Sequence, residues 1–136
     1  MIIYIDENLS PFLARGFNIL QEPLNFKLSD SVEVRSIKDD FGKGAKDEDW
    51  IPMAGESKAC VITQDYNIHR IAHQRELCNK YKLGMFYFRP PSKSGLSYMD
   101  MLKLMVKHWE EITKIATNQK RPFTYKVTSR GRITKI

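Results

Sequence analysis

The sequence predicts a three-layer α/β fold with a mainly parallel sheet of about four strands. Two apolar runs carry most of this prediction: residues 2–5, which lead into Asp6, and residues 59–64, which lead into Asp65. Short runs rich in β-branched residues and bounded by polar ones are typical of strands buried on both faces of a parallel sheet. Segments with helical spacing separate the strands, as an alternating α/β domain requires.

A helix is expected directly after the first strand, because Ser10 can cap it and Pro11 suits its first position. Its apolar positions repeat at helical spacing, and Pro23 should limit it. A second strand is expected over residues 31–37. Gly42 and Gly44 then mark a loop before a short helix that runs from about Asp47 to residue 59.

The second half of the chain continues the alternation. A third strand is expected over residues 59–63, a helix from about 68 to 81 closed by Gly84, and a fourth strand over 85–88 stopped by Pro90. Residues 102–116 have the three-four spacing of an amphipathic helix. Residues 123–136 alternate like a β-hairpin or an arm. We therefore expect a domain over residues 1–119 and a C-terminal extension, residues 120–136, packed on it or projecting from it.

The charge is concentrated at the C-terminal end. The chain carries a net formal charge of +6, and residues 120–136 hold six basic residues and no acid, so the other 119 residues hold 16 of each sign. A basic appendage suits contact with a polyanion, because cationic side chains release counterions from phosphates. The alternative is a solvated tail. We expect this segment to contact substrate or a partner rather than the core.

Several classes of protein are disfavoured. No run of about 18 apolar residues suggests a membrane span, and the N-terminus enters a strand without a leader-like segment. Cys60 and Cys78 lack metal-ligand spacing and are expected to be reduced core residues of a cytoplasmic protein. His69 and His73 lie one helical turn apart, but a solvated pair is favoured over a zinc site. No nucleophile elbow, phosphate-cradling loop or dinucleotide fingerprint is present.

Acidic residues follow two of the predicted strands. Asp6 and Asp65 should meet at the carboxyl edge of the sheet, where open α/β sheets bind ligands. Two carboxylates brought together repel unless a cation lies between them, so a divalent metal site is predicted. The cluster Asp47-Glu48-Asp49 could supply a third acid, although acids in the first turn of a helix are also favoured by the macrodipole. Oxygen ligands alone suit Mg²⁺ or Mn²⁺.

These motifs, in this order, resemble those of PIN-like domains, including the VapC-type toxins of toxin–antitoxin pairs. The resemblance covers roughly residues 2–90 and rests on the segments 3–9, 47–51 and 61–65. It implies a metal-dependent ribonuclease in which Asp6, Asp47 and Asp65 hold the metal and perform catalysis. Asp49 lies close enough to Asp47 to take its role. Asn67 stands where many such nucleases carry a fourth acid, which leaves a weaker metal site or a loss of catalysis as alternatives.

The expected function is therefore endoribonuclease activity with Mg²⁺ or Mn²⁺, in the toxin of a toxin–antitoxin pair. Expected partners are an RNA substrate, an antitoxin protein and a second copy of the chain. The residues expected to support the acids are Asn8, Thr63 and Asn67. Those expected to contact RNA are Arg70, Lys93, Arg130 and Arg132. Two alternatives remain open: a catalytically silent PIN-like module that binds RNA or protein, and a receiver-like phosphoacceptor domain.

Overall fold

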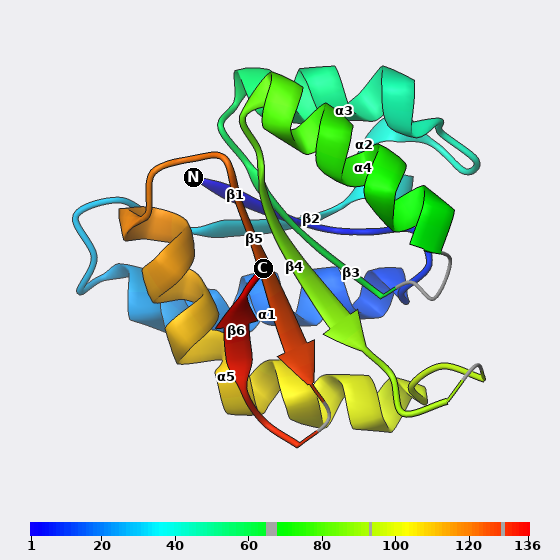
Figure 1. Ribbon diagram of the computed structural model, residues 1–136. Coiled ribbons are helices and arrows are strands. Elements are labelled where there is room, and N and C mark those ends of the chain that lie inside the picture. The colour runs from blue at the N-terminus through cyan, green and yellow to red at the C-terminus, as the bar shows by residue number, and fades with distance from the viewer. Residues whose placement is uncertain (65–67, 93, 129) are drawn as a thin grey trace.

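The computed structural model describes residues 1–64, 68–92, 94–128 and 130–136 (Figure 1). Strands and helices alternate along most of the chain. Their order is β1 (Ile2–Ile5), α1 (Pro11–Asn25), β2 (Glu33–Ser36), α2 (Ile37–Phe41), α3 (Asp47–Glu56), β3 (Cys60–Gln64), α4 (Ile68–Tyr81), β4 (Gly84–Arg89), α5 (Tyr98–Asn118), β5 (Phe123–Thr128) and β6 (Ile133–Lys135). The α/β class and the mainly parallel sheet are confirmed. Across the described ranges, no helix has the length and apolarity needed to cross a membrane.

The sheet has the order β2-β1-β3-β4-β5-β6. All neighbouring strands are parallel except β6, which is antiparallel to β5. β2 is added on one side of β1, whereas β3 and the later strands are added in succession on the other side. The order therefore reverses between β1 and β3, and open α/β sheets bind ligands in the crevice at such a switch point, outside the carboxyl ends of the strands.

Helices cover both faces of the sheet (Figure 1). On one face, α1 and α5 pack against the sheet, and the rings of Phe17 and Trp109 lie 4.7 Å apart between the two helices. On the other face, α2, α3 and α4 contribute a second core built around Trp50, Ile51 and Cys78. Side chains alternate between these two cores along each strand, so β1, β3 and β4 are buried on both faces.

Three local predictions differ from the structure. Pro23 lies inside α1 rather than ending it, because the Asn25 side chain exchanges hydrogen bonds with both backbone groups of Val32 and secures the last turn. The second strand is shorter than expected, and the unpredicted helix α2 follows it at once, capped by Ser36. Gly84 does not close α4. It begins β4, where the ring of Phe123 leaves no room for a Cβ atom.

The C-terminal segment forms the predicted β-hairpin, but the hairpin belongs to the sheet, which was not expected. The sheet has six strands rather than about four, because β5 pairs along the whole length of β4 and β6 folds back on β5. Phe123 and Val127 are buried in the core beneath α5. The expectation that this segment lies outside the core is therefore wrong for β5. Alternation alone did not reveal that its apolar side chains complete the face of a sheet.

Candidate active site at the carboxyl edge of the sheet

Asp6 lies immediately after β1 and is almost completely buried, with 1% of its surface exposed. Its Oδ2 atom accepts a hydrogen bond of 2.6 Å from the hydroxyl of Thr63 on the neighbouring strand β3. Its Oδ1 atom accepts one of 2.8 Å from the backbone N–H of Glu7. Both oxygens are thus fixed, and the carboxylate lies at the switch point between β1 and β3.

Asp47 is the first residue of α3, and its side chain is 11% exposed. The indole N–H of Trp50 donates to Oδ1 at 3.1 Å, and the amide of Gln74 donates to Oδ2 at 3.3 Å. Asp49 is exposed on the same turn. Of the two acids that the sequence could not separate, Asp47 is the one that lies beside Asp6.

Arg70 of α4 lies between the two carboxylates. Its Nη2 atom is 3.7 Å from Asp6 Oδ2, and its Nε atom is 3.7 Å from Asp47 Oδ2. The motifs that contain Asp6 and Asp47 have no basic residue of their own, and the sequence suggested only a phosphate contact for Arg70. The guanidinium instead stands where two converging carboxylates require a positive charge.

The environment of Asp6 raises the pKa of its carboxyl above the ordinary value. Burial is the largest cause, because it penalises the charged form, and the nearby charge of Asp47 acts in the same direction. The Thr63 hydrogen bond, the charge of Arg70 and the Glu7 amide oppose the rise. A carboxyl that is buried beside a second acid in a crevice is a common feature of functional sites.

Asn8 and Thr63, both predicted to support the acids, contact each other across the edge of the sheet. The Asn8 amide lies 3.4 Å from Thr63 Oγ1 and also donates to the backbone carbonyl of Gln64. The loop after β1 is thereby tied to the end of β3. These contacts hold the two carboxyl ends of the switch point together.

Sequence reasoning missed Gln74, which is fully buried on α4. Its amide links Asp47 to the hydroxyl of Tyr87, whose oxygen lies 3.3 Å from Gln74 Oε1. The available signal was spacing, since Arg70 and Gln74 are four residues apart and share one face of the helix. The inner face of α4 is therefore polar where it meets the acids.

A cleft of about 310 Å³ opens beside the acids. It is lined by Glu7, Asn8, Lys38, Lys43, Gly44 and Arg70. The two lysines were not predicted as site residues, because they follow β2 in a segment without a motif. Three cations around a cleft next to buried carboxylates suit an anionic substrate.

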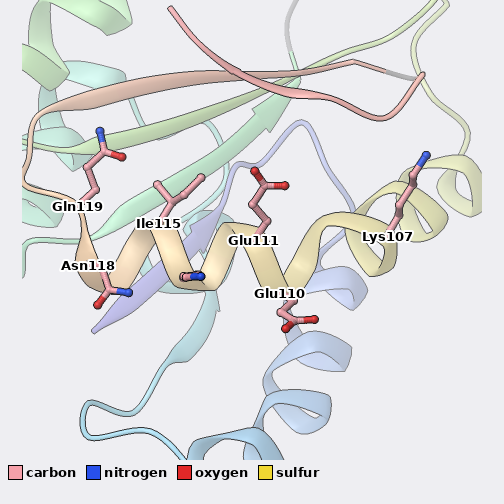
Figure 2. Close-up of a pocket in the computed structure, with 7 residues that line it drawn as sticks. Lys107, Glu110, Glu111, Ile115, Asn118 and Gln119 are labelled. Atoms are coloured by element: carbon pink, nitrogen blue, oxygen red, sulfur yellow. The ribbon is translucent and has the colours of Figure 1, made fainter.

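A larger groove of about 810 Å³ lies on the other face of the molecule. It runs along α5, and Figure 2 shows Glu111 and Ile115 pointing from this helix toward the C-terminal strands. None of its lining residues belongs to the acidic site. We therefore place the candidate active site at Asp6 and Asp47, beside the smaller cleft, which shares Arg70 with them.

Three of the other predicted site residues are not among the described ones, and two lie away from the acids. Asp65, Asn67 and Lys93 lie outside the described residues. Arg130 and Arg132 are exposed in the connection between β5 and β6, at the same carboxyl edge but beyond β4. His73 is paired with Glu48 at 2.6 Å on the surface, and the side chain of His69 is not described.

The donor set around Arg70 suits a hard cation, because Asp6 and Asp47 present carboxylate oxygens toward one position. Within the part of the chain that the structure describes, no three His, Cys, Asp or Glu residues form a group that could hold a metal ion. A site with three carboxylates would therefore need an acid from outside the described ranges. Asp65, directly after β3, is the candidate.

Comparison with known proteins places this arrangement in a family. A family model described as a PIN like domain matches residues 1–90, which include β1 to β4 and both described acids of the site. No curated protein and no solved structure matches the chain. Since the matched region covers well over half of the 136 residues, the chain belongs to the family of PIN-like domains, whose fold is of the nuclease type.

Proposed function

We propose that this protein is a metal-dependent endoribonuclease that hydrolyses RNA phosphodiester bonds. The observation that carries the proposal is the convergence of Asp6 and Asp47 on one cation position, at the switch point of the sheet. Membership of a family whose domains are typically nucleases supports the same chemistry. The cationic cleft beside the acids supports a phosphate-bearing substrate.

In this proposal Asp6, Asp47 and Asp65 would hold Mg²⁺ or Mn²⁺, which when bound would polarise a phosphate and lower the pKa of a water molecule. Thr63 fixes Asp6 by its hydrogen bond, while Trp50 and Gln74 fix Asp47. Arg70 would neutralise both acids in the free protein and would pair with a phosphate oxygen beside Asp6 in the complex. Asn67 and Lys93 remain proposed as supporting and RNA-contacting residues.

The test is an RNA cleavage assay with Mn²⁺ on single-stranded and hairpin substrates. Asp6→Asn, Asp47→Asn and Asp65→Asn should each abolish cleavage while the far-ultraviolet circular dichroism stays unchanged, because asparagine keeps the shape and removes the charge. Asp49→Asn is the matched control, since it removes an exposed acid from the same helical turn. An active Asp47→Asn variant and an inactive Asp49→Asn variant would show that the second acid has been misassigned.

A second candidate function is a silent PIN-like module that binds RNA without cleaving it. The specific observation in its favour is Arg70, because an ion pair to each acid satisfies their charges without any metal. Binding of RNA in the presence of a chelator, together with no cleavage at any Mn²⁺ concentration, would support this module. Cleavage that Asp6→Asn removes would exclude it.

We further propose that the protein is the toxin of a toxin–antitoxin pair. An exposed apolar stripe on α1, formed by Phe12, Ile19, Leu20 and Leu24, supports a protein partner, because clustered apolar side chains on a surface commonly mark interaction sites. The test is growth arrest on expression in bacteria, relieved by Asp6→Asn and by co-expression of a neighbouring small open reading frame. Light scattering of the purified chain distinguishes a second copy from an antitoxin as the partner.

A further inference from the structure

The face of the sheet that carries Asp6 continues beyond the helices that cover it. Thr63, Tyr87, Lys126 and Thr134 lie in register across β3, β4, β5 and β6, so their side chains share one face of the sheet. This is the face of Asp6, because Thr63 donates its hydrogen bond there. α3 and α4 pack over β1, β3 and β4, and none of the described residues of β5 or β6 joins that core.

Lys126 is consequently only partly covered, and Thr134 is exposed. Two neighbouring strands are about 4.8 Å apart, so Lys126 on β5 lies two strand spacings, roughly 10 Å, from Thr63 on β3. The open surface therefore begins within one or two nucleotides of the acidic site. It is bounded along one side by α4 (Figure 1).

Two arginines lie on the same surface. Arg89 is exposed and follows Tyr87 by two residues on β4, which returns its side chain to the same face. Arg75 of α4 follows Gln74, and its charge acts on the Tyr87 hydroxyl; burial raises the pKa of this hydroxyl and Arg75 opposes the rise. We call Arg75, Arg89 and Lys126 the basic shelf.

The shelf has no acidic partner in the described part of the chain: none of its three cations forms an ion pair with a carboxylate there. The segment from residue 120 to the C-terminus contains no acid at all. Thr128 and Thr134 add hydroxyl groups, which together with cationic side chains are common donors to phosphate oxygens. The chemistry of the surface is that of a phosphate-binding track.

We propose that the basic shelf binds the backbone of single-stranded RNA on one side of the phosphate held at Asp6 and Asp47. The inference rests on the proposed ribonuclease function and extends it to the path of the substrate. We propose single-stranded RNA as the ligand because the open surface is narrow. It spans about two β-strand spacings, roughly 10 Å, between α4 and the edge strand β6. An RNA leaving the acids in this direction crosses β4 and then β5.

The experiment measures binding of a labelled single-stranded RNA to the full chain by fluorescence anisotropy, in chelator so that no cleavage occurs. The shelf variant is Arg75→Gln/Arg89→Gln/Lys126→Gln. The matched control, Lys27→Gln/Lys103→Gln/Lys114→Gln, removes the same charge from exposed positions at the end of α1 and along α5, on the opposite face. Thermal melting confirms that both variants are folded.

Three lost phosphate contacts should lower the slope of log K against log salt by roughly 2, because each contact to a single strand contributes about 0.7. The control should keep the wild-type slope. If the triple shelf variant does not fold, Arg89→Gln alone should lower the slope by about 0.7. A shelf variant that binds like the control, wild-type protein that does not bind RNA in chelator, or equal preference for duplex RNA would overturn the proposal.

The two proposals fail in different ways. If the wild type never cleaves RNA but the shelf variant loses RNA binding, the proposed ribonuclease function is wrong and the proposed RNA-binding role of the basic shelf is supported. If the wild type cleaves RNA but the shelf variant keeps the wild-type KM and the wild-type slope of log K against log salt, the ribonuclease function is supported and the proposed path of the RNA is wrong.

Discussion

The Thr63 hydroxyl donates a hydrogen bond of 2.6 Å to Asp6 Oδ2, across the two strands between which the order of the sheet reverses. Both residues are buried: Thr63 is 0% exposed and Asp6 is 1% exposed. A carboxylate removed from water needs such partners in its charged form. The bond therefore links the core of the fold to the chemistry proposed for its edge.

Thr63→Val should destabilise the protein by about 1.5 to 3 kcal/mol at pH 7, because valine keeps the shape of threonine but removes a hydrogen bond to a charged group. The loss should be smaller near pH 4, where Asp6 is more often protonated. Urea unfolding at the two pH values measures both quantities. An equal loss at both would mean that Thr63 acts through packing and not through the charge of Asp6.

Because the pKa of the Asp6 carboxyl is raised in the folded protein, its contribution to stability should decrease as the pH rises. Asp6 has a higher pKa in the folded chain than its ordinary value, chiefly because it is buried, so the folded state binds the extra proton. Its contribution to the free energy of unfolding is full below the unfolded pKa and is lost as the pH rises through the folded pKa. The amide that replaces this carboxyl in an Asp6→Asn variant cannot titrate.

The stability of the wild type minus that of Asp6→Asn should therefore decrease as the pH rises through this window. Urea unfolding of both proteins between pH 3.5 and 7, in chelator, measures the difference. Asp49→Asn serves as the control, because it makes the same substitution at an exposed acid of the neighbouring helix α3. A difference that grows with pH would mean that Arg70 and Thr63 outweigh burial at Asp6.

Mn²⁺ should raise the melting temperature of the wild type, because a ligand that binds only the folded state shifts the unfolding equilibrium by mass action, by about 2.7 kcal/mol at 100 times Kd. Asp6→Asn/Asp65→Asn should show no shift. Arg70→Gln should show a larger shift than the wild type, since the cation between Asp6 and Asp47 is then absent.

Differential scanning calorimetry with and without millimolar Mn²⁺ makes this comparison. Asp49→Asn should keep the wild-type shift. The same shift in the wild type and in the Asp6→Asn/Asp65→Asn variant would place the ion elsewhere on the chain.

Most of the elements and the position of Asp6 could be predicted because their signals are local. Ser10 accepts from the N–H of Phe12 as a cap, and an apolar strand ends one residue before Asp6. Helix α4 has the predicted bounds, Ile68–Tyr81, because apolar spacing defines it. Such signals need only a few neighbouring residues.

The remaining features depend on contacts between distant segments. Arg70 and Gln74 reach the acids because they lie on the face of α4 that meets them. The packing of α4 on β3 and β4 determines which face this is. The pairing of β5 with β4 joins residues about 40 positions apart. The role of Gly84 could not be predicted for the same reason, because its partner Phe123 is remote in sequence.

Gly84→Ala should destabilise the protein by about 1 to 3 kcal/mol, the usual cost of overpacking a core. A Cβ atom at residue 84 would clash with the ring of Phe123, its partner on β5, which packs against the ring of Phe86. Room can be made only if the aromatic ring or the strand pairing shifts. Urea unfolding measures the change in free energy.

Gly16→Ala is the matched control, because residue 16 is helical and a Cβ atom there meets nothing within 4 Å. Alanine is favoured over glycine inside a helix, so this variant should be stabilised by up to about 1 kcal/mol. Phe123→Leu should relieve the penalty of Gly84→Ala if the ring is its cause, so that the two changes are not additive. Additive losses would show that residue 84 requires glycine for its backbone, and that the close approach of β5 is not the reason.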